Sequence, residues 1–213
     1  MAYMAGVGKS TMYRIFVGWL VFLETLFSQL DLKPDDGFLL KKMPDIFVRT
    51  GHGLTDLVID CTEFKFQHAT NFELNSLIFS NYKNTVTGKA LIGISAHGSG
   101  LFFSDIYPGS ISDSAITEET AVLEWVRPEH ELMSDRGFFV QDHCSIKGVF
   151  LNRPAQKDTD QFSPADVAAN FDIASTRIHV ERFIGRVRNF LVLLCHFCSC
   201  SVQDRAKIFS FVS

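Results

Sequence analysis

Three strand candidates follow one another in the middle of the chain, and this succession limits the folds open to the sequence. They cover residues 57–66, 90–96 and 101–107. The second and third flank the tight turn HGSG, which predicts a hairpin. The middle of the chain is therefore expected to form antiparallel strands from local sequence.

Helix and strand alternate after the hairpin. A helical face begins at Asp113, and strand candidates at 131–135 and 148–152 are separated by a helix or a loop. A long helix is expected over roughly 166–194, with Asn170 as a candidate break point. Because parallel crossovers need a helix, this order predicts an α/β fold of the ribonuclease H-like type. We expect a mixed sheet of three antiparallel strands followed by β-α crossovers, with helices on both faces.

The N-terminal segment carries a different pattern. Apolar residues recur at three- and four-residue spacing from Met12 to Leu30, which predicts one face of a helix capped by Ser10 or Thr11. The sequence KPDDG then ends the helix. Four units follow from these patterns: a helical segment over 1–30, a linker with short helical pieces over 31–53, the ribonuclease H-like domain over 54–195 and a tail over 196–213.

Composition narrows the class of protein. Hydrophobic residues make up 46% and Phe occurs 21 times, so the chain folds around a dense aromatic core. A net charge of −4 argues against a uniformly basic nucleic-acid binder but allows a local basic face. The 5 cysteines suggest a reducing compartment rather than a disulfide framework. We expect no membrane span, because Glu24 and Gln29 interrupt the most apolar early stretch.

Three carboxylates occupy positions where a charge is costly. Asp60 interrupts the apolar run LVIDC, Asp135 ends the strand candidate ELMSD, and Glu181 lies inside the last helix. Brought together, they would suit Mg²⁺ or Mn²⁺, and two such ions support phosphodiester chemistry. The alternatives stay open at this point, because an Asp at a strand end commonly caps a helix and a helical Glu commonly pairs with a neighbour such as Arg177.

Five stretches resemble the catalytic domain of Harbinger-type transposases, within the DDE superfamily endonucleases. They fall in that family's order, cover about two-thirds of the chain and read IDCTEF (59–64), SNYKNTVTGKALIGIS (80–95), YPGSISDSAIT (107–117), MSDRGF (133–138) and IASTRIHVERFIGRVRNF (173–190). The resemblance implies a ribonuclease H-like fold, divalent-metal dependence and cleavage of transposon ends with strand transfer. It also implies double-stranded DNA as partner, with an accessory DNA-binding protein and a homo-oligomer as further expectations, and a nuclear location.

Matched residue by residue, the resemblance assigns the acidic triad to Asp60, Asp135 and Glu181, as catalytic residues and as ligands of a two-ion Mg²⁺ or Mn²⁺ site. Positive charge suited to a DNA backbone, or to a solvated helix face, comes from Arg136, Arg177, Arg182, Arg186 and Arg188. Arg136 and Arg182 are the candidate DNA contacts among them. Asp113 is expected to cap a helix and is left outside the triad.

The sequence GKST near the N-terminus is not a phosphate-binding loop, because that motif needs Gly where this chain has Tyr3. It is similar to the short helix-turn-helix that precedes the catalytic domain in these transposases, which makes Lys9, Ser10, Tyr13 and Arg14 candidate DNA contacts. The alternative is an ordinary helix that docks on the catalytic domain.

The remaining expectations concern the two ends of the chain. Both ends look truncated relative to the family, so a catalytically inactive, domesticated or decayed transposase that acts as a DNA- or protein-binding module is the alternative function. The cluster LCHFCSC offers Cys195, His196, Cys198 and Cys200 as zinc ligands, but thiols on a helix explain it more simply.

Overall fold

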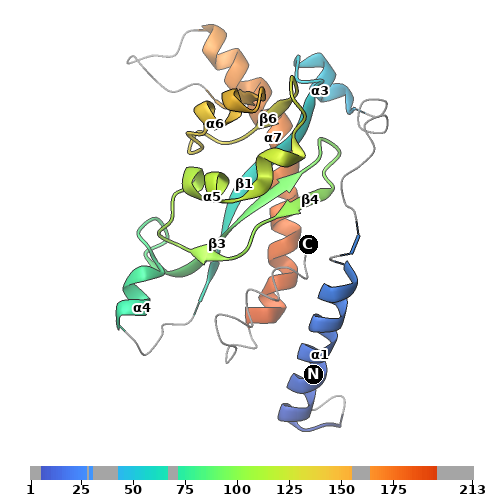
Figure 1. Ribbon diagram of the computed structural model, residues 1–213, viewed down its shortest axis with the longest axis vertical. Helices are drawn as coiled ribbons and strands as arrows, with labels where there is room; N and C mark the ends of the chain where they lie inside the picture. Colours follow the sequence, from blue (N-terminus) through green and yellow to red (C-terminus); the bar gives the residue numbers. More distant parts are fainter. Residues whose placement is uncertain (1–5, 28, 31–42, 67–71, 155–163, 196–213) are drawn as a thin grey trace.

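The computed structural model describes residues 6–27, 29–30, 43–66, 72–154 and 164–195 (Figure 1). These residues form a seven-stranded mixed sheet whose central order is β2-β3-β1-β6-β7, with β4 and β5 also paired to β3. The strands are β1 (Thr55–Lys65), β2 (Phe79–Ser80), β3 (Thr85–Ile94), β4 (Gly100–Phe103), β5 (Tyr107–Pro108), β6 (Glu131–Met133) and β7 (Phe150–Asn152). β1 and β4 are antiparallel to β3, whereas β6 is parallel to both β1 and β7. This arrangement confirms the expected ribonuclease H-like class.

The described helices are α1 (Lys9–Phe27), α3 (Asp45–Arg49), α4 (Phe72–Leu77), α5 (Asp113–Glu119), α6 (Gln141–Ile146) and α7 (Pro164–Cys195), with a 3₁₀ helix η1 (Ala121–Trp125). The helical face expected after Asp113 is two pieces, because Thr120 adopts an extended conformation between α5 and η1. α7 is continuous through Asn170, so the candidate break point there is wrong. α1 begins at Lys9, which places the predicted caps Ser10 and Thr11 inside its first turn.

Alternation along the central strands divides the interior into two cores. Val58, Ile92 and Met133 face one side of the sheet, where they pack with α7 residues such as Val180 and Ile184. Their chain neighbours Leu57, Leu91 and Leu132 face the other side and pack with residues of α5, η1 and α6. Successive side chains of a strand point to opposite faces, so a sheet covered on both sides reads as a continuous apolar run. In Figure 1, α7 accordingly crosses one face and α5 lies on the other.

The HGSG turn joins β3 to β4 as the sequence predicts. Gly98 adopts a φ of 83°, a left-handed conformation that favours glycine. Its backbone N–H donates to the Ser95 carbonyl at 2.9 Å, and the Ser95 N–H donates to the Ser99 carbonyl at 2.9 Å. The turn is therefore closed by its own backbone, and it presents His97 on the side of α7.

α1 touches the remainder of the structure through few side chains. Leu20 is buried and Phe16 packs against the α7-side core, whereas Ile15, Trp19 and Phe22 are exposed. By length and composition alone this helix could cross a membrane, since its mean hydropathy reaches 1.2 and only 6% of it is buried. A core helix or a signal sequence meets the same criterion, so the expectation of no membrane partner stays a prediction.

α3 lies in the segment expected to be a linker with short helical pieces, of which residues 31–42 lie outside the described part. Its central residue Phe47 is fully buried in the α7-side core, and its ring lies 6.2 Å from that of His179 on α7. A residue from the linker segment thus completes the core of the sheet domain.

Phe47→Ala is expected to lower the free energy of unfolding by about 3–5 kcal/mol, because it leaves a cavity in a closed core. The neighbouring Val48→Ala, whose side chain is 59% exposed, is expected to change it by less than about 0.5 kcal/mol. Denaturant unfolding of both variants measures the difference, and equal effects would mean that α3 is not part of the folding unit.

Candidate active site

The register of two parallel strands brings two of the predicted carboxylates together. Val58 of β1 pairs with Met133 of β6, and Asp60 and Asp135 each follow their strand's paired residue by two positions. β6 ends at Met133 whereas β1 continues to Lys65, so the two carboxylates lie where β1 runs on beyond its neighbour. The carboxyl ends of parallel strands are where open α/β sheets place their ligands.

Arg177 of α7 joins the two aspartates. Its guanidinium lies 3.8 Å from the Asp60 carboxylate and 3.2 Å from that of Asp135, with the Arg177 side chain 10% exposed. The adjacent Thr176 donates to the Met133 sulfur at 3.0 Å, which fixes this turn of α7 over the end of β6. Arg177 is therefore a buried partner of the carboxylates, and the prediction that it belongs to a DNA-facing or solvated helix face is wrong.

The surroundings of Asp60 make its carboxyl group harder to ionise. Burial raises the pKa of its carboxyl group, and the charges of Asp135 and Asp113 raise it further, whereas Arg177 and the Cys61 N–H lower it, so that the pKa stands at about 6. The Cys61 backbone N–H donates to Asp60 Oδ1 at 2.8 Å, and the Arg136 N–H donates to Asp135 Oδ1 at 2.7 Å. A cation bound here would relieve the repulsion among these carboxylates.

Asp113 belongs to this site, and the expectation that it caps a helix is wrong. The cap of α5 is Ser112, whose hydroxyl accepts the Ala115 N–H at 3.1 Å. The Asp113 carboxylate instead accepts from Lys89 Nζ at 3.1 Å. A side chain at Gly137 would lie 3.1 Å from the same carboxylate, so this glycine lets the loop after β6 approach Asp113 closely. The signal in the sequence was Ser112 itself, which fills the capping role and leaves Asp113 for another.

Lys89 is the buried basic residue next to Glu63 and Asp113. Its ammonium lies 3.9 Å from the Glu63 carboxylate as well as near Asp113, and it donates to the Ile111 carbonyl at 2.8 Å. Thr87 donates to the other oxygen of Glu63 at 2.8 Å. The side chains of Lys89 and Glu63 are 12% and 9% exposed, so this pair is fixed by burial and by three hydrogen-bond partners. Neither residue was identified from the sequence.

These side chains line one cleft of about 590 Å³. Four carboxylates and three basic side chains contribute to its wall, together with polar and small residues: Asp60, Glu63, Asp113, Asp135, Lys83, Lys89, Arg188, Cys61, Tyr82, Ser112 and Gly137. Tyr82 and Lys83 are exposed, with the Lys83 ammonium 4.4 Å from the Tyr82 ring centre. Arg188 of α7 donates to Thr62 at 2.9 Å. Burial and the nearby Asp113 charge raise the pKa of the Cys61 thiol, so it remains protonated.

Glu181 is not among the residues that line the cleft. It is exposed and lies on α7 between Arg177 and Arg188, which spacings of four and seven place on one side of the helix. No ion pair joins Glu181 to another described residue, so the alternative in which Glu181 pairs with Arg177 is not found. Within the described ranges, no three His, Cys, Asp or Glu side chains are arranged to hold a metal ion. The structure brings Asp60 and Asp135 together, and the role of Glu181 stays a prediction.

The donor set nevertheless suits a divalent cation. Carboxylate oxygens are what Mg²⁺ and Mn²⁺ prefer, and Asp60 and Asp135 already share one cationic partner in Arg177. The raised pKa of Asp60 marks a position where added positive charge is favourable. Asp60 and Asp135 therefore fit the expected metal.

The other predicted site residues lie elsewhere. Lys9, Ser10 and Arg14 are exposed on the first turns of α1, Tyr13 is half-buried there, and none of them lines the cleft. Arg136 is exposed in the loop that carries Asp135, and Arg182 faces a separate groove on α7. Cys198 and Cys200 lie outside the described residues, as do any residues before Gly6 that would complete a helix-turn-helix.

Comparison with known proteins agrees with this geometry. Residues 59–213 match the family described as DDE superfamily endonuclease, which covers most of the chain and all the carboxylates of the cleft. The chain belongs to this family of transposase-like nucleases, whose substrate is DNA and whose members typically use divalent metals. No curated protein and no solved structure matches it.

In metal-free buffer, Asp60→Asn is expected to raise the free energy of unfolding by up to about 3 kcal/mol above about pH 6. The folded pKa of about 6 exceeds the ordinary 3.8, so the ionised carboxylate costs stability at high pH. That cost disappears as the pH falls from about 6 to about 4, where the variant and the parent converge.

Thermal melts across this pH range in a chelator measure the effect. Asp105→Asn, at an exposed loop carboxylate outside the cleft, is the matched control and should show no such convergence. A loss of stability of equal size at every pH would contradict the electrostatic account of Asp60.

Proposed function

We propose that this chain is a Harbinger-type transposase endonuclease that hydrolyses phosphodiester bonds at transposon ends and transfers the resulting strand. The observation that carries the proposal is the meeting of Asp60, in the middle of β1, with Asp135, just after the end of the parallel strand β6, within a DDE endonuclease domain. Double-stranded DNA is the proposed substrate. A nuclear location, an accessory DNA-binding protein and a homo-oligomer remain proposals drawn from the family resemblance.

Asp60 and Asp135 are the proposed metal-holding residues, with Glu181 as the third acid of the triad. Mg²⁺ or Mn²⁺, as one or two bound ions, would activate a water or a 3′-hydroxyl and stabilise the leaving oxygen. Glu181 lies one helical turn beyond Arg177, so a small movement of α7 or of its side chain would direct it toward the aspartates.

The basic residues of the cleft have separate proposed roles. Arg177 holds the two aspartates in place before metal binds, and Lys89 holds Asp113 beside them. Arg188 and the exposed Lys83 lie where a phosphodiester backbone entering the cleft would meet positive charge. Tyr82 adds an exposed ring on which a base can stack.

Nicking of supercoiled plasmid with Mn²⁺ or Mg²⁺ tests the activity. Asp60→Asn and Asp135→Asn are each expected to lower the cleavage rate by about 100-fold or more, because a bound metal contributes several kcal/mol to stabilising the transition state. Glu181→Gln should lower it by a similar factor if Glu181 completes the triad. Asp105→Asn is the control and should cleave as the parent does.

Calorimetric titration with Mn²⁺, alone and with DNA present, separates metal binding from chemistry. Loss of Mn²⁺ binding in both aspartate variants, with melts that show them folded, would support the assigned ligands. A folded parent that never nicks DNA with either metal would end the claim of activity for this chain.

A DNA- or protein-binding module without activity is the second candidate function. The observation that favours it is the contact of Arg177 with both aspartates while Glu181 stays exposed. It predicts salt-sensitive DNA binding that survives replacement of all three acids, together with no cleavage by the parent.

A further inference from the structure

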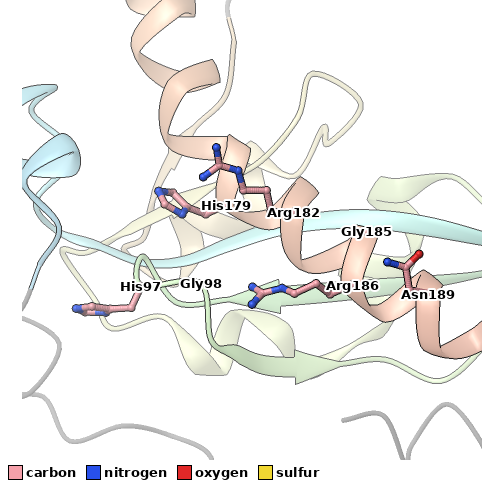
Figure 2. Close-up of a pocket in the computed structure, with 7 residues that line it drawn as sticks. All are labelled: His97, Gly98, His179, Arg182, Gly185, Arg186 and Asn189. Atoms are coloured by element: carbon pink, nitrogen blue, oxygen red, sulfur yellow. The ribbon is translucent and has the colours of Figure 1, made fainter.

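A second groove lies on α7, away from the carboxylate cleft (Figure 2). Its volume is about 670 Å³, and it shares no lining residue with the cleft. One wall is His97 and Gly98 of the β3–β4 turn. The other is a face of α7 formed by His179, Arg182, Gly185, Arg186 and Asn189. In Figure 2, Arg186 extends from the helix toward the turn.

The charge of this groove differs from that of the cleft. Two arginines and two histidines line it, and no carboxylate does. Arg182 and Arg186 are exposed, and neither forms an ion pair with another residue in the described part of the chain. Arg186 lies 5.6 Å from the centre of the Phe183 ring, which orients its guanidinium. Burial lowers the pKa of His179, and the Arg182 charge lowers it further, so His179 contributes a neutral imidazole to this wall.

Gly185 gives the groove an open floor. It sits in the middle of a long helix, where glycine is unfavourable, and a side chain added there would meet nothing within 4 Å. Packing within the described structure therefore does not require glycine at this position. Its absence of a side chain exposes the helix surface between Arg182 and Arg186, where a bound group can approach the backbone closely.

The spacing of the polar side chains favours an extended anion. His179, Arg182, Arg186 and Asn189 follow one another at intervals of three, four and three residues, which places them in a row on one face of α7. Ten residues of helix span roughly 15 Å. Phosphates of one DNA strand recur every ~3.4 Å along the axis, so such a row meets several of them, whereas a small anion would meet only one part of it.

We propose that the groove between the β3–β4 turn and α7 binds the phosphate backbone of DNA, on a segment separate from the one that enters the carboxylate cleft. The inference rests on the proposed function in taking DNA as the ligand. α7 would then hold DNA on two sides, with Arg188 at the cleft and Arg182 and Arg186 at the groove. Guanidinium groups suit this task because their planar donors match phosphate oxygens.

The test is binding of a labelled DNA duplex to the full chain, followed by fluorescence anisotropy in a chelator at several salt concentrations. The double variant Arg182→Gln/Arg186→Gln is expected to weaken binding about tenfold at low salt and to lower the salt slope by about one to two. Arg49→Gln/Lys147→Gln removes the same two charges from exposed positions outside the groove and is the matched control. Equal losses in the two double variants would overturn the proposal.

Gly185→Gln tests the groove without changing charge. It is expected to weaken DNA binding several-fold while the melting temperature stays the same or rises, because glutamine is the better helix former and its side chain meets open space. Binding equal to that of the parent would overturn the proposal. Calorimetry with inorganic phosphate alone is a further arm, and saturation by it with no groove-dependent DNA binding would also overturn the proposal.

The plasmid assay separates this inference from the proposed function. Cleavage that depends on Asp60, with DNA binding unaffected by the groove variants, would support the nuclease proposal and overturn the proposal that the groove binds DNA. DNA binding that depends on Arg182 and Arg186, in a parent that never cleaves DNA, would support DNA binding by the groove and contradict the proposed nuclease activity.

Discussion

The parallel pairing of β1 with β6 is the constraint on which the site depends. Because Val58 lies opposite Met133, Asp60 in the middle of β1 and Asp135, two residues after β6 ends, lie close enough to share Arg177. β1 continues past the end of β6 and carries Glu63 into the same cleft. The antiparallel pairing of β1 with β3 brings Lys89 opposite Glu63. The single strand β1 therefore positions both the Asp60–Asp135 pair and the Glu63–Lys89 pair.

Electrostatics explains why the cleft is organised around two buried cations. Four carboxylates on one wall repel one another, and burial adds the cost of lost hydration. Arg177 offsets this at Asp60 and Asp135, and Lys89 offsets it at Glu63 and Asp113. The Nε atom of Arg177 is buried without a hydrogen-bond partner, so its pairing is incomplete. A further cation bound among these carboxylates would lower their mutual repulsion.

Burial of a carboxylate does not by itself mark a functional residue. Asp60 of β1 lines the cleft, yet Asp56 in the same strand is more deeply buried, at 3% exposure. Burial raises the pKa of Asp56, but hydrogen bonds and charge from Arg127, with His130, lower it below its usual range, and the group serves as a structural ion pair. The partner of each aspartate decides its role, and those partners lie far away in sequence. Asp113 was missed for the same reason, since Lys89 is visible beside it only in the fold.

Local pattern indicated β1, β3, β4, β6 and β7, the HGSG hairpin, the long last helix and the ribonuclease H-like order, because periodicity and turn chemistry act over a few residues. The two-residue strands β2 and β5 were not predicted, because strands this short carry no periodic pattern. The sequence also identified Asp60 and Asp135, and the family motifs placed the chain among the DDE endonucleases. Only the tertiary structure decided that Arg177 is buried between the aspartates, that Phe47 closes the core and that Glu181 stands outside the cleft. These outcomes depend on strand register and on how α7 docks, which are set by packing between segments distant in the chain.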